Sequence, residues 1–318
     1  MFKKWMMIIG LLIPLMGCNS LAFLQGKTNQ PMIPIKIETL FYTPGDFTRI
    51  DVRGELTLNI HTGARSAWFS MHGDSRDLRN IEWKVKPKSK TLRIRLDGRF
   101  PKHGPVTIDI GARQLDAILY HGNGNVTGRR LYSKQLDVEI NNSKNTFTLL
   151  EGRMNLRHVS LSGDGKIQIN GGGNNSMDLT IRGKVHAKIT GTTTPKKIDM
   201  AGSSYLNLPQ VRAKDMQLTM TSDSNAQLAG TAQWALIKMD GNAHFNGRSL
   251  RITEAFVRTD DYAMALIYVT SKQHTLASGQ SNIYYYNVAT YQTDFMAKNG
   301  TILNLGAEKS RKKSNKRQ

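Results

Sequence analysis

A polar turn, often containing glycine, recurs along most of this chain at spacings of 19 to 21 residues. Each turn is followed by a short segment in which apolar and polar residues alternate. A repeat of this length and regularity requires one structural unit per repeat. The turn positions are Gly122, Asn142, Gly163, Gly183, Gly202, Ser222, Gly241, Asp260, Gly279 and Gly300.

The apolar residues keep a constant phase with these turns. The residue four before each turn forms a nearly unbroken apolar column: Ile118, Val138, Val159, Leu179, Ile198, Leu218, Ile237, Phe256, Thr275 and Met296. Alternation at every second residue indicates strands, and a fixed register allows equivalent strands to stack. We therefore predict an all-β fold, a single-stranded parallel β-helix (solenoid) with coils of about 20 residues. An antiparallel sandwich or barrel is the alternative, although it needs no column in constant phase with the turns.

Residues 38–306 are predicted to form one β-helical domain. The stretch from Phe47 to Ile110 is rich in strand-forming residues but does not follow the repeat. We expect it to form longer, irregular coils that begin the helix and cap its open end, which a stacked array requires. Residues 18–37 are predicted to be a flexible tether, and residues 307–318 a basic disordered tail.

The N-terminus has the pattern of an export signal. Lys3 and Lys4 precede a short apolar run, and Leu15-Met16-Gly17-Cys18 resembles the lipobox of bacterial lipoproteins. We predict a lipoprotein signal peptide at residues 1–17 and lipidation of Cys18, the one cysteine of the chain. The alternative is an ordinary signal peptide with an incidental buried thiol. Asn19 follows the cysteine in place of aspartate, which predicts localisation to the outer membrane.

The charge predicts the kind of partner. The chain has 44 Lys and Arg against 24 Asp and Glu, a formal charge of +20, which falls by two when the signal peptide leaves. Such a charge attracts anionic surfaces but does not determine a fold. The expected partners are the membrane through the N-terminal lipid, anionic envelope glycans or lipopolysaccharide, or a protein partner. Nucleic acid is not expected as a physiological partner of an exported chain.

Several segments together resemble the head GIN domain family, described as the head of an autotransporter adhesin. The resemblance covers about residues 40–306, and some of its turns lack the expected glycines, at Asn142, Ser222 and Asp260. It implies the β-helix predicted above and an adhesin-like role, and it brings no catalytic residues. The matching segments are Phe47–Gly54, Leu58–Gly63, His72–Asp74, Leu92–Ile94, Leu115–Gly124, Leu161–Gly165 and Ser278–Tyr285.

One outward column holds a candidate for catalysis. Asp137, His158 and Asp178 are predicted to stack on three successive coils, with the carboxylates about 9.6 Å apart from the strand spacing. This lies near the upper limit for inverting glycosidases. The same ladder is also explained as a surface arrangement that relieves contact between like charges. No other enzyme fingerprint occurs in a fitting context, and the remaining histidines have no metal-ligand spacing, so we expect no catalysis, no metal and no cofactor.

Two further groups are candidates for ligand binding. Cations alternate with apolar residues over residues 83–96, and one strand with its return would present them on one face: Lys84, Lys86, Lys88, Lys90, Arg93 and Arg95. Lysines in such a place also protect a sheet edge from aggregation. Tyr284 and Tyr286 point outward if Tyr285 points inward; outward rings stack on sugars, or pack across strands under a capping loop.

These observations predict an outer-membrane-anchored β-helical lipoprotein that binds or scaffolds cell-envelope components without catalysis. A polysaccharide-active hydrolase or lyase is one alternative. A structural subunit of an envelope protein assembly is the other.

Overall fold

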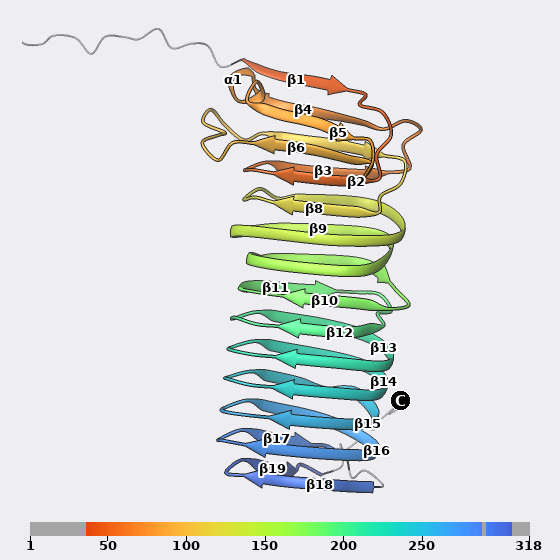
Figure 1. Ribbon diagram of the computed structural model, residues 1–318, viewed down its shortest axis with the longest axis vertical. Coiled ribbons are helices and arrows are strands. Elements are labelled where there is room, and N and C mark those ends of the chain that lie inside the picture. Colours follow the sequence, from red (N-terminus) through yellow and green to blue (C-terminus); the bar gives the residue numbers. More distant parts are fainter. Residues whose placement is uncertain (1–35, 288–290, 307–318) are drawn as a thin grey trace, which may run out of the picture. The chain divides into compact units, whose positions relative to one another are not determined.

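The computed structural model describes residues 36–287 and 291–306, with the side chains of 143–145 and 291–295 left out of the description. The structure is 71% strand and 2% helix and forms a β-solenoid of about nine turns (Figure 1). The predicted all-β solenoid is confirmed, and the long parallel pairings contradict the sandwich or barrel. The predicted signal peptide, Cys18 and the predicted tail at 307–318 lie outside the described residues.

The strands follow one another with a single helix among the described residues, α1 (Ser75–Leu78). In chain order they are β1 (Ile37–Tyr42), β2 (Arg49–Arg53), β3 (Thr57–Thr62), β4 (Trp68–Asp74), β5 (Ile81–Lys86), β6 (Thr91–Leu96), β7 (Thr107–Ala112), β8 (Ala117–His121), β9 (Val126–Gly173), β10 (Met177–Ile181), β11 (Lys184–Ile189), β12 (Pro195–Met200), β13 (Tyr205–Met220), β14 (Asn225–Met239), β15 (His244–Thr259), β16 (Met264–Ser278), β17 (Asn282–Tyr285), β18 (Tyr291–Lys298) and β19 (Thr301–Asn304).

From β8 onward, equivalent strands of successive coils lie side by side in parallel (Figure 1). The pairing is in register over most of each coil: Ile198 lies beside Leu218, and Leu218 beside Ile237. These side chains are fully or almost fully buried and form one continuous core with their equivalents in the other coils. The apolar column therefore arises because each coil buries its inward residues on those of the next.

The column departs from the prediction near its C-terminal end. Phe256 is 37% exposed, while the next residue, Val257, is fully buried and occupies the column. The left-handed backbone of this corner is at Asp261, with φ of 56°, and not at Asp260, so the count from the turn is wrong by one residue. A shift of one residue moves a strand side chain to the opposite face. Met296 is also exposed, at 60%, after a register shift between β16 and β18.

The N-terminal coils are not stacked in chain order. β2 lies between β6 and β8, and β3 lies between β7 and β9, all in parallel. The coil of β2 and β3 is therefore enclosed by two coils that come later in the chain. β4 pairs antiparallel with both β7 and β1, and β5 pairs antiparallel with β6. The purely parallel description is therefore wrong for this part, where antiparallel strands join the coils.

The corners of successive coils approach too closely for most side chains. Gly163, Gly183 and Gly202 have left-handed backbones at equivalent corners, with φ of 96°, 84° and 79°. A Cβ atom on Gly183 would lie 2.4 Å from the carbonyl oxygen of Gly163. Glycine is required here both by the backbone conformation and by the stacking of one corner on the next.

Candidate functional site

The basic hairpin consists of β5, β6 and the turn between them. Its antiparallel register places Lys84 opposite Arg93 and Lys86 opposite Thr91, and Arg95 is two residues beyond Arg93. Because alternate residues of a strand share a face, four of the predicted cations lie on one side of the hairpin. The structure therefore brings Lys84, Lys86, Arg93 and Arg95 together.

Lys88 and Lys90 do not share this strand face. β5 ends at Lys86, and both later lysines lie in the turn, where Lys90 has a left-handed φ of 46°. The predicted alternation fails after Lys86 because the turn breaks the period of two. Both lysines are exposed at the tip of the hairpin.

The hairpin face also contains carboxylates. Asp51 of β2 is only 5% exposed and accepts hydrogen bonds from Nε of Arg93 at 2.9 Å and Nε of Arg53 at 3.1 Å. Glu82 lies opposite Arg95 across the hairpin. Arg93 is thus a partner of a buried acid, whereas Lys84 and Arg95 are exposed. We conclude that Arg93 holds β6 to β2, and that the other cations of the hairpin determine the charge of the surface.

The predicted Asp-His-Asp ladder lies on the same sheet face as the hairpin. β6 pairs with β2, β2 with β8 and β8 with β9, and this last pairing places Ala117 beside Asp137. Asp178 pairs directly with His158, as predicted. The three ladder residues therefore extend the face toward the later coils.

The ladder has the stacking of the prediction, but one of its two carboxylates, Asp137, is paired with an arginine. Nε of Arg157 donates to Asp137 at 2.9 Å, and this guanidinium holds the pKa of the Asp137 carboxyl below its usual value of 3.8. His158 and Asp178 form an exposed pair, with 3.6 Å between Nδ1 and Oδ2. A general acid needs a raised pKa, so Asp137 is unsuited to that role. The arrangement fits the alternative, in which the ladder is a surface network of opposite charges.

The tyrosine pair has the predicted alternation. Tyr285 packs against the core, and Tyr284 and Tyr286 on either side of it are half-buried. Tyr284 lies beside Leu266 and Leu303 of neighbouring coils, and the ring of Tyr286 lies 4.9 Å from the guanidinium of Arg248. Arg248, which the sequence prediction did not include, therefore supplies a cation–π contact. These contacts support cross-strand packing for both rings.

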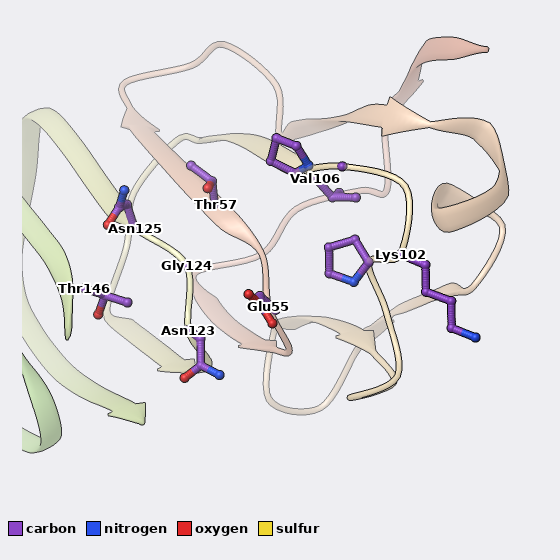
Figure 2. A pocket seen from close by; sticks show the side chains of 11 residues that line it. Glu55, Thr57, Lys102, Val106, Asn123, Gly124, Asn125 and Thr146 are labelled. Carbon is purple, nitrogen blue, oxygen red and sulfur yellow. The ribbon is translucent and has the colours of Figure 1, made fainter. Parts of the chain in front are cut away.

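An open pocket of about 510 Å³ lies where the chain passes from β6, β2 and β8 to β7, β3 and β9 (Figure 2). Its lining comes from the corner between β2 and β3 with the first residue of β3, the corner between β8 and β9, the connection at residues 97–106, and one residue of β9. The lining residues are Glu55, Thr57, Pro101, Lys102, Gly104, Pro105, Val106, Asn123, Gly124, Asn125 and Thr146. We call this the corner pocket.

A buried carboxylate holds the wall of the corner pocket. Asp77 of α1 is fully buried and accepts hydrogen bonds from the backbone N–H groups of Lys102, at 3.1 Å, and His103, at 2.8 Å. Nδ1 of His103 lies 3.0 Å from the same carboxylate. Burial raises the pKa of Asp77, but these hydrogen bonds outweigh it and hold the pKa below 3.8. The connection at residues 97–106 is therefore fixed to the helix beneath it.

The floor of the corner pocket is held by a buried tyrosine. The Tyr120 hydroxyl donates to the carbonyl oxygen of Leu56 at 2.8 Å and accepts from the N–H of Gly124 at 2.6 Å. Burial raises the pKa of Tyr120 to about 12, so the hydroxyl stays protonated at neutral pH. One side chain thus ties together the two corners that line the pocket.

Sequence reasoning missed the corner pocket. Part of its lining, from Glu55 to Val106, lies in the region predicted to form irregular coils, and the rest belongs to the first coils of the repeat. Its residues therefore come from separate segments of the chain. One indication was present: residues 97–106 contain two prolines and two glycines between strands, and the connection is much longer than the corners at 54–56 and 122–125. A long insertion at one corner of a repeat protein often marks a binding face.

No helix within residues 36–287 and 291–306 is long and apolar enough to cross a membrane. The same residues contain no group of three or more His, Cys, Asp or Glu side chains placed to hold a metal ion.

Comparisons with solved structures find similar chains in several bacteria, among them two Parabacteroides species. A "putative adhesin" from Parabacteroides merdae has a TM-score of 0.49 and 14% identity, with 85% of this chain and 96% of that chain covered. A "putative adhesin" from Parabacteroides distasonis has a TM-score of 0.48 and 14% identity, with 85% and 98% covered. A "putative lipid binding protein" from Parabacteroides distasonis has a TM-score of 0.46 and 13% identity, with 86% and 97% covered.

No curated protein matches the sequence. A family model described as "Putative auto-transporter adhesin, head GIN domain" matches residues 46–194 and 153–289, which together make up well over half of the chain. The overlap of the two matches agrees with the repetition of the coils. The predicted resemblance is therefore confirmed, and this β-solenoid chain belongs to the head GIN domain family.

Proposed function

We propose that this protein is a lipid-anchored adhesin of the outer membrane that binds anionic envelope glycans or lipopolysaccharide through the basic hairpin, without catalysis. The observation that carries the proposal is the gathering of cations on one face of the hairpin. Lys84, Lys86 and Arg95 lie on the outward side of two paired strands, and Arg49 and Arg53 lie on the adjacent strand β2. Lys88 and Lys90 extend the positive charge to the tip of the hairpin.

The distribution of charge supports a local contact with a polyanion. Beyond β2, the same face contains the carboxylates of Asp137, Glu139 and Asp178, and the Glu139 carboxylate lies 3.0 Å from Nε2 of His121. Phosphates or carboxylates of a polymer are therefore attracted more to the hairpin end than to this part of the face, where Asp137 is paired with Arg157 and the charges largely balance. Binding of this kind weakens as salt screens the charges.

The lipid anchor and the location rest on the sequence. Cleavage before Cys18 and acylation of its thiol and amine would attach the chain to a membrane by several acyl chains, which hold more firmly than one. Asn19 directs such a lipoprotein to the outer membrane. Mass spectrometry of the protein from membranes tests this step, since acylation adds mass to a peptide that begins at Cys18.

The ligand is tested by binding of the full chain to immobilised lipopolysaccharide at low and high salt. The variant Lys84→Gln/Lys86→Gln/Arg95→Gln removes three cations of the hairpin and leaves the Arg93–Asp51 pair intact. The control Lys188→Gln/Lys196→Gln/Lys214→Gln removes three exposed lysines elsewhere, so both variants have the same net charge. We expect the hairpin variant to bind about tenfold more weakly at low salt and the control to bind like the wild type.

Equal losses in both variants would show that binding follows net charge alone and would contradict a hairpin site. Absence of any binding to lipopolysaccharide or to acidic glycans would contradict the ligand class, and would favour a protein partner. Release of new reducing ends from a glycan during the assay would contradict the non-catalytic role.

A further inference from the structure

We propose that the corner pocket is a second binding site, distinct from the basic hairpin, and that it takes an uncharged saccharide of one or two sugar rings. The volume of about 510 Å³ lies within the range of roughly 300–1,000 Å³ usual for ligand pockets. Binding of a saccharide in this pocket is independent of the anionic ligand proposed for the basic hairpin.

The lining determines the chemistry of the ligand. Besides Lys102, the polar side chains are one carboxylate, Glu55; two carboxamides, Asn123 and Asn125; and two threonines, Thr57 and Thr146, of which the Thr146 hydroxyl is buried. Carboxylates and amides are the groups that accept from and donate to sugar hydroxyls. Figure 2 shows Glu55 and Asn123 on the same side of the pocket. Such a lining favours a ligand with many hydroxyl groups over an apolar one.

The charges of the lining do not favour an anion. Lys102 is the one cation among the lining residues, and its ammonium lies 5.1 Å from the ring of Phe100. Glu55 supplies the opposite charge. The pocket therefore lacks the excess of cations that the hairpin has, and binding here is expected to depend little on salt.

The pocket is built in advance of binding. The wall at residues 97–106 is fixed by the fully buried Asp77, and the floor by Tyr120. The carboxamide of Asn125 is oriented by the backbone N–H of Phe147, which donates to its Oδ1 at 2.9 Å. A site held in this way loses little conformational entropy when a small ligand binds. Gly124 cannot carry a side chain, because a Cβ there would lie 2.0 Å from the carbonyl oxygen of Leu56.

The experiment measures binding of maltose, cellobiose, lactose and N,N′-diacetylchitobiose to the full chain by calorimetry, at low and high salt. The variants are Glu55→Ala and Asn123→Ala. Asn242→Ala is the matched control, because Asn242 follows the corner glycine Gly241 as Asn123 follows Gly122, but in a coil far from the pocket. Hydrogen exchange of the wild type with and without each sugar gives a readout that needs no variant.

We expect at least one of the four sugars to bind, with an affinity unchanged by salt. Glu55→Ala and Asn123→Ala should weaken it at least tenfold, and Asn242→Ala should not. The bound sugar should slow exchange at residues 97–106 and 122–125. If none of the sugars binds, or if exchange slows elsewhere and not at these segments, the proposal is wrong.

The triple hairpin variant separates this inference from the proposed function. This variant should keep its full affinity for the sugar while its binding to lipopolysaccharide is weakened. Loss of both ligands in that variant would contradict two distinct sites, whereas lipopolysaccharide binding without sugar binding would overturn the pocket alone.

Discussion

Asp77 shows how one buried charge can position a surface loop. Its carboxylate has no solvent exposure, and the hydrogen bonds that compensate for burial come from Lys102 and His103, which are distant in the sequence. A buried carboxylate without such partners would be costly. The residue therefore belongs to the structural support of the corner pocket rather than to its lining.

The substitution Asp77→Asn tests this support. An amide keeps one acceptor but places an NH₂ group against backbone donors, so we expect a loss of about 1–3 kcal/mol in the free energy of unfolding. Chemical denaturation measures the loss, and hydrogen exchange should become faster at residues 97–106. Asp97→Asn is the control, since Asp97 is exposed and pairs with Arg99 at the surface. An equal effect of both substitutions would contradict the role of Asp77.

The low pKa of Asp77 has a consequence for acid stability. Because the folded state holds the pKa below 3.8, the carboxylate stabilises the fold above that pH, and the contribution is lost as the pH falls further. We expect the free energy of unfolding of the wild type to fall below about pH 4. The fall should be smaller in Asp77→Asn, because an amide does not titrate. Parallel pH profiles for the two proteins would contradict this assignment.

Among the structural elements, the stacking of the corners determines which residues the turns can contain. Gly183 and Gly63 have the same φ of 84°, but a Cβ on Gly63 would meet no atom within 4 Å. Gly63→Ala therefore measures the cost of the left-handed backbone conformation alone, and we expect it to lower the free energy of unfolding by about 1 kcal/mol. Gly183→Ala adds a clash with the carbonyl oxygen of Gly163, and we expect it to lower the free energy of unfolding by roughly 3 kcal/mol or more. Thermal or chemical denaturation measures both losses of stability. Equal losses in the two variants would contradict the role of corner stacking.

The coils could be predicted because glycine recurs at one corner, and the inward apolar residues of each coil lie at fixed distances in sequence from that glycine. Where a corner lacks glycine, as at Asp260 and Asp261, the sequence does not show which residue has the left-handed backbone, and the phase error placed Phe256 in the core. The cations of β5 and β6 could be predicted from alternation alone. The corner pocket could not, because it is made by pairings between segments whose order in the stack differs from their order in the chain.

At the scale of the molecule, each coil is stabilised by its neighbours, and the two ends differ. β19 pairs along its length with β17 alone among the described strands, whereas β13 is paired with β12 and β11 on one side and β14 on the other. In a stacked array, stability is a sum over neighbouring interfaces. We expect hydrogen exchange measured by mass spectrometry to be faster in β19 than in β13. Equal protection of both strands would indicate that the solenoid opens as a single cooperative unit.

The enclosure of the β2–β3 coil also determines how the fold responds to mechanical load. If the protein is held at its N-terminus while a ligand pulls on the solenoid, tension reaches the described structure at β1 and passes next to β2. β1 pairs only with β4 among the described strands, but β2 is bonded to β6 on one side and to β8 on the other. A strand bonded on both edges must break both ladders before it can leave. The chain would therefore yield easily at its first strand and then resist at its second, which gives the molecule a mechanical stop close to its point of attachment.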